Sequence, residues 1–236
     1  MSATPTTASG FPRFRAVAEH GVLVEFGDVI GREVHDQVRR LDSVLASKPF
    51  DGFIETIPAY TNLLVCFDPI RTDHAAVRTA VSTLLHDDSA VLPRGAVHEA
   101  HVCYDAEFAP DLAEVAERTG LTAEEVIAAH LAGDYSVFMY GFAPGFAYLA
   151  GVPQTIQIPR KPSPVRGIAS GSVLMAGPQC LVTTLVMPTG WWIIGRSPTR
   201  ILRDDDAEHP VLFDVGDTVR FRRIDRATYD AEERRR

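Results

Sequence analysis

The chain has 236 residues, of which 46% are hydrophobic and 23% charged, a globular composition with enough length for one core or two small ones. Its formal net charge of −8 argues against a basic face for phosphate backbones, so we expect no nucleic-acid partner. The three cysteines are widely spaced and form no C-x-x-C pair, which predicts reduced thiols packed in a core.

The N-terminus has no charged start followed by an apolar run, so it does not resemble a secretory signal. Residues 167–195 contain no charged side chain, but glycines and prolines divide them into short pieces. Because a membrane helix needs about 20 uninterrupted apolar residues, we interpret this segment as buried strands joined by turns. We therefore expect no membrane span and a cytoplasmic location.

Residues 1–95 are predicted to form a first domain in which pairs of strands alternate with helices. Its apolar runs predict four strands, at residues 14–18, 22–26, 53–57 and 63–67. Apolar residues from Ile30 to Leu45 repeat with a helical period, and a second helix is expected to follow Thr72 or Asp73 as its N-cap. This order predicts a small α+β sandwich, with the helices on one face of a mostly antiparallel sheet.

Residues 96–236 are predicted to form a second domain, after a linker at 87–96. Its expected elements are helices at 110–119 and 122–132 and strands at 97–104, 135–142, 173–176, 181–186, 192–194, 211–213 and 218–224. Thr122 and Glu125 form a capping-box pattern for the second helix. Many short strands with glycine and proline turns predict a barrel or closed sandwich, and residues 225–236 are interpreted as a charged tail.

Motifs of a self-contained catalytic or nucleotide-binding site are absent from the sequence. There is no G-x-x-x-x-G-K-[ST] loop, no G-x-G-x-x-G after a strand and no H-E-x-x-H helix. His98 and His101 lie three residues apart on a predicted strand and therefore point to opposite faces, which argues against a shared metal ion. The acidic residues at 204–209 fit a solvated loop better than a cation site, so no metal site is predicted.

The segment Tyr140–Leu149 has the sequence YGFAPGFAYL, in which two glycines and a proline interrupt regular structure after a strand. Glycine permits close approach of the backbone to a ligand, and the interleaved aromatic residues can line a pocket. The alternative is a tight turn whose aromatic side chains belong to the core, and the spacing alone does not separate the two.

Three arginines follow this segment close to proline residues, at positions 160, 166 and 196. A guanidinium fixed in a loop can bind a carboxylate or phosphate through two parallel hydrogen bonds, so the three are candidates for one anion site. The alternative is that each is a surface arginine or part of an ordinary salt bridge.

An ordered set of short motifs runs through the second half of the chain. In order, these are GF-x-PGF-x-YL-x-G-x-P, PR, GSV, AG-x-Q and P-x-GW-x-x-IGR-[ST]-P. On this set the chain resembles the family of 5-oxoprolinase B subunits, which includes allophanate hydrolase subunit 1, one half of the urea carboxylase carboxyltransferase domain and a bacterial sporulation-kinase inhibitor. The chain departs from the family pattern at residues 164–170 and 180–189, so the resemblance does not specify which amide is its substrate.

The resemblance implies an α+β fold: a small N-terminal α+β sandwich domain (residues 1–95) followed by a cyclophilin-like β-barrel domain (residues 96–236). It also implies a partner, a homologue of the C subunit of 5-oxoprolinase, equivalent to allophanate hydrolase subunit 2. In the oxoprolinase version a third protein, the A subunit, joins them, and ATP with Mg²⁺ drives opening of the 5-oxoproline lactam to glutamate. The chain is expected to be inactive alone.

Two alternative functions stay open at this point. In the carboxyltransferase version, the two halves move a carboxyl group from biotin on a companion protein to an amide-like acceptor. In the regulatory version, the chain binds a histidine kinase or another partner and has no catalytic role.

The residues and the resemblance together give the predicted site. The expected catalytic residues are His130, Arg160, Arg166 and Arg196. The expected substrate-binding residues are Gly141, Phe142, Pro144, Gly145, Phe146, Ser172, Gln179 and Trp191. Backbone N–H groups around Gly141–Gly145 are expected as further donors to phosphate or an oxyanion. His130 suits acid–base chemistry or the stabilisation of its own helix C-terminus, and Trp191 suits a pocket wall or the core.

Overall fold

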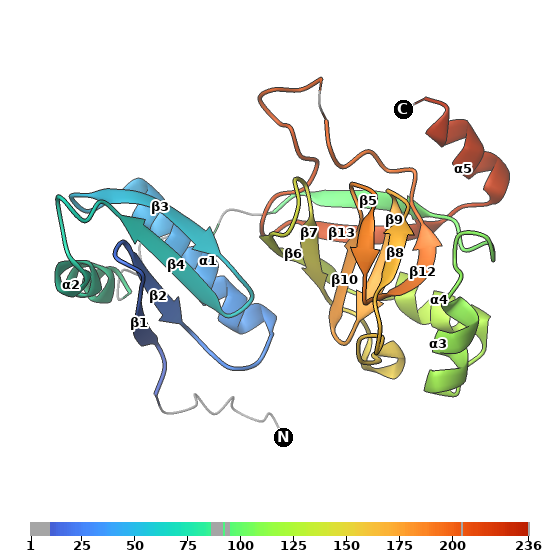
Figure 1. Cartoon of the computed structure of the whole chain (residues 1–236), viewed down its shortest axis with the longest axis horizontal. Coiled ribbons are helices and arrows are strands. Elements are labelled where there is room, and N and C mark those ends of the chain that lie inside the picture. Colours follow the sequence, from blue (N-terminus) through green and yellow to red (C-terminus); the bar gives the residue numbers. More distant parts are fainter. Residues whose placement is uncertain (1–9, 86–91, 93–94, 204, 236) are drawn as a thin grey trace. The chain divides into compact units, whose positions relative to one another are not determined.

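The computed structural model describes residues 10–85, 92, 95–203 and 205–235 (Figure 1). The chain divides into two compact units, residues 1–93 and 94–236, and each unit has its own hydrophobic core. Most of the predicted linker at 87–96 lies outside the described residues. Among the helices that are described, none combines the length and the apolar character that crossing a membrane requires.

The N-terminal unit is a four-stranded antiparallel sheet with two helices packed on one face, as predicted. Its elements are β1 (Arg13–Val17), β2 (Gly21–Glu25), α1 (Arg32–Ser47), β3 (Phe53–Pro58), β4 (Asn62–Phe67) and α2 (His74–Leu84). The strand order is β1-β2-β4-β3, and every neighbouring pair is antiparallel. Alternate apolar residues of the strands face the helices and form the core of this unit.

Local sequence signals account for both helices of this unit. α1 turns one face to the sheet, with buried residues His35, Val38, Leu41, Val44 and Leu45. At the start of α2, the carboxylate of Asp73 accepts hydrogen bonds from the N–H groups of Ala75 and Ala76, each at 2.9 Å. Asp73, and not Thr72, is therefore the N-cap.

The C-terminal unit is built around a seven-stranded sheet that curls into a barrel. Its elements are β5 (Val97–Val102), α3 (Leu112–Thr119), α4 (Ala123–Leu131), β6 (Tyr135–Tyr140), β7 (Ala147–Ala150), the 3₁₀ turn η1 (Gln154–Ile156), β8 (Val165–Ile168), β9 (Ser172–Ala176), β10 (Gln179–Val182), β11 (Met187–Thr189), β12 (Trp192–Arg196), β13 (Thr218–Arg223) and α5 (Arg226–Glu233). The strand order is β12-β9-β10-β7-β6-β13-β5, and β8 and β11 form a separate two-stranded ribbon. β13 and β5 pair in parallel, whereas the other neighbours are antiparallel.

The two edges of this sheet meet and close the barrel. Just beyond β5, the N–H of Cys103 donates to the carbonyl of Arg196 at 2.8 Å, and the N–H of Arg196 donates back at 2.9 Å. Gly195 permits this approach, because a Cβ there would lie 2.6 Å from Cγ1 of Val102 and 3.2 Å from the carbonyl oxygen of Cys103. Closure pairs backbone groups that an open edge would leave to solvent.

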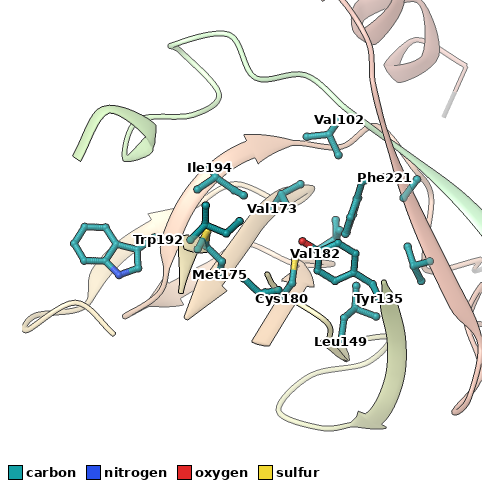
Figure 2. Close-up of a cluster of buried hydrophobic side chains, with 14 of the residues drawn as sticks. Val102, Tyr135, Leu149, Val173, Met175, Cys180, Val182, Trp192, Ile194 and Phe221 are labelled. Carbon is teal, nitrogen blue, oxygen red and sulfur yellow. The ribbon is translucent and has the colours of Figure 1, made fainter. Parts of the chain in front are cut away.

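Side chains fill the inside of the barrel, so its lumen is a packed core and not a channel. Figure 2 shows this cluster, with Val102, Tyr135, Leu149, Val173, Met175, Cys180, Val182, Trp192, Ile194 and Phe221 labelled. The helices α3 and α4 add Val115, Val126 and Ile127 to the same core. α4 begins as predicted, since Thr122 and Glu125 form a complete capping box.

The prediction of a charged tail after residue 225 was wrong, because this segment is the helix α5. Its N-cap is Asp225, whose carboxylate accepts a hydrogen bond from the N–H of Thr228 at 2.8 Å. Tyr229 of α5 packs on Phe108, with ring centroids 4.5 Å apart. This aromatic contact and the pairs of Arg226 with Glu107 and of Glu232 with His101 anchor a helix whose residues are largely charged or polar.

Some short strands also differ from the prediction. The strand expected at 211–213 is reduced to an isolated bridge between Leu202 and Val211. β7, β8 and β11 were not predicted, because they have only four, four and three residues and lie beside glycine or proline. Such surroundings predict turns when the chain is considered locally.

We expect the substitution Gly195→Ala to lower the free energy of unfolding by about 1–3 kcal/mol, because the new methyl group overlaps with Val102 and the backbone of Cys103. Gly190→Ala is the matched control in the same unit. A Cβ there meets no atom within 4 Å, and we expect a change below about 0.5 kcal/mol. Urea unfolding of the intact chain measures both variants. Equal stability of the two would show that the closure tolerates a side chain at position 195.

Candidate functional site

A hollow of about 170 Å³ lies on the outer face of the barrel, beside β11. It is lined by Phe142, Phe146, Tyr148, Arg160, Leu174, Leu181, Met187, Pro188, Thr189, Gly190 and Trp191, and we name it the aromatic pocket. Because side chains alternate along a strand, Leu174 and Leu181 belong to this pocket, while their neighbours Val173 and Val182 face the barrel core. The site therefore uses the outside of a barrel whose inside is packed.

The Gly141–Phe146 loop between β6 and β7 carries two of the aromatic side chains. The loop folds back on itself: the N–H of Gly141 donates to the carbonyl of Phe146 at 3.2 Å, and the N–H of Phe146 donates to the carbonyl of Ala143 at 3.1 Å. The hydroxyl of Thr184 donates to the carbonyl of Pro144 at 2.7 Å and fixes the loop from outside. The N–H groups of Gly141 and Ala143, which the sequence suggested as donors to an anion, are thus used inside the loop, since that of Ala143 donates to the carbonyl of Gly141 at 2.9 Å.

Phe142 is held outward in an uncommon backbone conformation. Its φ is +71°, a left-handed value that costs a non-glycine residue roughly 1–2 kcal/mol. The residue is 72% exposed, and its ring lies 5.5 Å from that of Phe146. An exposed aromatic side chain on strained backbone favours a role in binding over a role in packing.

The other aromatic rings continue from Phe146 as a wall. The Phe146 and Tyr148 rings are 5.5 Å apart and the Tyr148 and Trp191 rings 5.9 Å apart, both edge to face. Arg160 ends the row, with its Cζ 5.5 Å from the centroid of Trp191, a cation–π distance. Burial raises the pKa of Tyr148, and the charge of Arg160 opposes that rise.

The backbone on both sides of Arg160 is fixed. The carbonyl of Pro159 accepts a hydrogen bond from Nε1 of Trp192 at 2.6 Å. The N–H of Lys161 donates to the carbonyl of Gly190 at 2.7 Å. These two bonds hold the exposed Arg160 beside the pocket, where its guanidinium is the positive charge among the lining residues.

The structure brings four of the predicted site residues together in the aromatic pocket, namely Phe142, Phe146, Arg160 and Trp191. Gly141, Pro144 and Gly145 form the loop that carries the two phenylalanines, but they do not line the pocket. Trp191 meets both of its proposed roles, since it lines the pocket and is itself only 6% exposed.

The remaining predicted residues lie outside this pocket. Arg166 is exposed on β8, and Arg196 packs its guanidinium on the ring of Phe108, with Cζ 4.7 Å from the centroid. Ser172 is buried, and its hydroxyl donates to a backbone carbonyl at 2.8 Å. Gln179 begins β10 and is half-buried. The aromatic pocket thus contains one arginine, and the expected convergence of three on one anion does not occur there.

His130 lies in the barrel core and has no exposed surface. Its Nδ1 is 2.7 Å from the hydroxyl of Tyr104, and its Nε2 is 3.6 Å from Sγ of Cys180. Burial lowers the pKa of His130 to about 3, so the imidazole is neutral at physiological pH. This position supports neither the acid–base role nor the stabilisation of a helix C-terminus by positive charge.

Among the described residues, no group of three histidine, cysteine, aspartate or glutamate side chains is placed to hold a metal ion. Nε2 of His98 lies 2.7 Å from Oδ2 of Asp217, whereas Nδ1 of His101 lies 2.8 Å from Oε1 of Glu232. The two histidines of β5 therefore have separate carboxylate partners. Of the acidic segment considered from the sequence, Asp204 lies outside the described residues.

Several pocket residues were missed by the prediction, notably Tyr148, Leu174, Leu181 and Met187. Tyr148 follows Phe146 at the spacing of two residues that puts side chains on one face of a strand, so the sequence does hold a signal for it. The aliphatic residues give no such signal, because apolar residues of a strand are expected in the core and not outside a barrel.

Comparison with known proteins identifies the family. The family described as carboxyltransferase domain, subdomain C and D, matches residues 12–213. The chain belongs to this family. A Bacillus subtilis (strain 168) protein, named as the B subunit of 5-oxoprolinase, is 38% identical over 228 residues, which cover 91% of this chain and 94% of the relative. An Escherichia coli O157:H7 protein of the same name is 31% identical over 208 residues, which cover 87% and 93%.

Solved structures agree with the fold of this carboxyltransferase-domain protein. The crystal structure of TTHA0988 matches 87% of the chain at 32% identity with a TM-score of 0.75, and the chain spans only 40% of that protein. The K. lactis urea amidolyase matches 97% of the chain at 14% identity with a TM-score of 0.78, and the chain spans 16% of it. The predicted fold class, a small α+β domain followed by a cyclophilin-like barrel, is confirmed.

In this carboxyltransferase-domain protein, we expect Phe142→Gly to be more stable than Phe142→Ala by about 1 kcal/mol, because glycine alone relieves the left-handed backbone. Both variants lose the exposed ring, so ligand binding at the aromatic pocket should weaken equally in the two. Thermal unfolding compares their stabilities. A glycine variant that is less stable than the alanine variant would contradict the strain assigned to this position.

His130 should make stability depend on pH. In the unfolded chain the imidazole takes up a proton below its ordinary pKa of 6.5, whereas in the folded protein its pKa is about 3. Stability present above pH 6.5 is therefore lost as the pH falls towards 3, by about 1.4 kcal/mol per pH unit. His130→Gln removes the titrating group, and its unfolding free energy should fall less steeply between about pH 7 and pH 5. If the unfolding free energies of the two proteins, measured in urea, fell equally with pH, the assignment of a neutral buried imidazole would be contradicted.

Proposed function

We propose that this chain is the B subunit of an ATP-dependent 5-oxoprolinase, which opens the lactam of 5-oxoproline to give glutamate. Support comes from the two relatives of that name, which are 38% and 31% identical over most of the chain. The structural observation that carries the proposal is Arg160, fixed at the end of an aromatic wall beside a hollow suited to a small ring.

The aromatic pocket matches the chemistry of 5-oxoproline, a flat five-membered lactam that bears a carboxylate. In the proposed complex, the guanidinium of Arg160 binds the carboxylate through charge-assisted hydrogen bonds, and the ring lies against Trp191 and Tyr148. The hollow has a volume of about 170 Å³, whereas pockets for drug-sized ligands measure roughly 300–1,000 Å³. Its size therefore favours a small substrate over a nucleotide.

An amide resists hydrolysis because its nitrogen donates electrons into the carbonyl group. In the proposed reaction, ATP with Mg²⁺ would supply the activation: its γ-phosphoryl group would pass to the amide oxygen with release of ADP, and after water adds to the carbon the C–N bond would break and phosphate would leave. The residues of this chain do not fit the nucleotide by themselves, because the sequence holds no phosphate-binding loop and the pocket is small. We therefore assign substrate binding to this chain and the nucleotide to another protein of the complex.

The rim of the aromatic pocket supports the proposal of a partner chain. Phe142 is 72% exposed and Val186, next to the pocket residue Met187, is 71% exposed. Exposed apolar side chains gathered around a small site are typical of a surface that another chain covers.

The proposed partner is a homologue of the C subunit of 5-oxoprolinase, or allophanate hydrolase subunit 2, and the A subunit is a further component. The chain alone is then inactive, and the complex works in the cytoplasm, where ATP is available.

A second candidate is favoured by the description of the matching family, carboxyltransferase domain, subdomain C and D. In this function the chain is one half of a carboxyltransferase that moves a carboxyl group from biotin, held by a companion protein, to an amide-like acceptor. The two candidates differ in what they need, because the first consumes ATP with 5-oxoproline and the second requires a biotinylated partner.

The proposed function is tested by reconstituting the chain with its C and A partner proteins and measuring glutamate formed from 5-oxoproline with ATP. We expect Arg160→Ala to lower kcat/KM about 10- to 100-fold, mainly through a higher KM, because a charge-assisted bond to the substrate is lost. Arg166→Ala is the matched control, since Arg166 is exposed on β8 outside the pocket. Its kcat/KM should stay within about twofold of the unsubstituted complex.

Two results would contradict these assignments. A stable complex that forms no glutamate would overturn the oxoprolinase function. Carboxyl transfer from biotin to an amide would then be the reaction to assay. An equal loss in the two arginine variants would overturn the role of the aromatic pocket, because the control lies outside it.

A further inference from the structure

A second hollow, of about 360 Å³, borders the Gly141–Phe146 loop away from the aromatic pocket residues. It is lined by Ser170, Thr183, Thr184, Thr199, Arg200, Ile201 and Leu202, and we name it the hydroxyl hollow. Thr184 holds the loop through its bond to the carbonyl of Pro144, and Leu202 packs where a Cβ on Gly145 would lie. One loop therefore presents its phenylalanines to the aromatic pocket and its Pro144–Gly145 corner to the residues of the hydroxyl hollow.

The walls of the hydroxyl hollow are fixed by backbone bonds between three separate segments. The N–H of Gly171 donates to the carbonyl of Thr183, and the N–H of Ser197 donates to the carbonyl of Gly171, each at 2.7 Å. Thr183 is only 1% exposed, and all other lining residues are buried or half-buried. The lining residues lie in the connections between strands, and these bonds hold the connections against one another.

Three of the four lining hydroxyls donate their proton to a backbone carbonyl, whereas the fourth, that of Thr199, accepts a hydrogen bond from the N–H of His101 at 3.2 Å. The hydroxyl of Ser170 donates to the carbonyl of Thr184 at 2.9 Å, and that of Thr183 donates to the carbonyl of Ala169 at 2.9 Å. The hydroxyl of Thr184 donates to Pro144 at 2.7 Å. Because a hydroxyl has one proton and two lone pairs, a hydroxyl that already donates can meet a ligand only as an acceptor. Thr183 is almost fully buried and its oxygen already accepts from the N–H of Ser172 at 2.9 Å. The hydroxyls of Ser170 and Thr184 are therefore the two that favour a ligand with N–H or O–H donors.

The charge at the hollow argues for a neutral ligand. The guanidinium of Arg200 is paired with the carboxylate of Asp205 through two contacts, at 3.0 and 3.1 Å. This pairing offsets the positive charge that would otherwise attract an anion. A carboxylate ligand would also bring further acceptors to hydroxyl oxygens that need donors, and such an arrangement leaves buried acceptors unpaired.

We propose that the hydroxyl hollow is a second binding site, for a small neutral ligand that presents N–H donors, such as a primary carboxamide. The N–H groups of the ligand donate to the hydroxyl oxygens of Ser170 and Thr184, and its carbon end rests on Ile201 and Leu202. This site goes beyond the proposed function, because it needs neither the carboxylate of 5-oxoproline nor Arg160. The ligand class follows from the donor–acceptor pattern and from the paired charge.

The test uses the whole chain, without partners or ATP, in a ¹H–¹⁵N NMR titration with three probes of similar shape. Acetamide has N–H donors, N,N-dimethylacetamide has none, and acetate is a charged acceptor. We expect acetamide to give saturable shifts at the N–H signals of residues 170, 184 and 202, when titrated to roughly 100 mM because so small a ligand buries little surface. The other two probes should shift these signals at least about fivefold less at equal concentration.

Paired variants separate a hydroxyl effect from a change of shape. We expect Thr184→Val, which keeps the size of the side chain but removes the hydroxyl, to weaken acetamide binding about five- to tenfold. Thr184→Ser keeps the hydroxyl and should bind within about twofold. Ser170→Ala provides a second removal at a position that does not contact the loop carbonyl. The NMR spectrum of each variant shows directly whether it is folded.

Several outcomes would overturn this proposal. These are the absence of any saturable shift with acetamide, equal binding of N,N-dimethylacetamide, or unchanged binding in both Thr184→Val and Ser170→Ala. Titration of the same sample with 5-oxoproline should instead shift the indole N–H of Trp191, because that ligand is assigned to the aromatic pocket. Failure at one hollow is therefore distinguishable from failure at the other.

Discussion

Two backbone hydrogen bonds between Cys103 and Arg196 join the ends of β5 and β12, and with them the two edges of the seven-stranded sheet. Once the sheet is closed, the alternation of side chains along each strand sorts every residue to the inside or the outside of the barrel. The inside is filled by one apolar core. Ligands are therefore left with the outer face and the loops, which is where both hollows lie.

The same closure explains a motif that looks chemical in the sequence. In the run Ile194-Gly195-Arg196, the glycine has no room for a side chain, and the arginine contributes its backbone to the joint. The guanidinium of Arg196 then packs on Phe108, whose ring also carries Arg226 of α5 at 4.5 Å. An arginine in a family motif thus has a structural explanation, and the anion-binding role is left to Arg160.

Much of the fold could be predicted from the sequence, because its signals are local. Alternating apolar residues gave the strands of the N-terminal unit, and Asp73 and the Thr122–Glu125 pair marked two helix starts that the structure confirms. The helix α5 was missed because its anchor, Tyr229 on Phe108, joins residues far apart in the chain. Such a contact has no local signature.

The candidate site was predictable in part for the same reason. The glycine- and proline-broken aromatic segment singled out Phe142 and Phe146, and the family motifs added Arg160 and Trp191. His130 was misjudged because a histidine near a helix end gives no sign of whether it faces solvent or the core, and here it is sealed between Tyr104 and Cys180. Burial is a property of the closed barrel, and the sequence around a residue does not contain it.

The neighbouring tryptophans illustrate what the alternation of side chains achieves. Trp191 lines the aromatic pocket and packs with the outer cluster, whereas Trp192 belongs to the barrel core. One peptide bond therefore separates two indole rings in different surroundings, one lining a pocket and one packed in the barrel core with Arg118 and Lys161 beside its ring. The chain has two tryptophans in all, so its intrinsic fluorescence is the sum of their two emissions. The emission of Trp191 responds to occupancy of the aromatic pocket, and that of Trp192 responds to unfolding of the barrel.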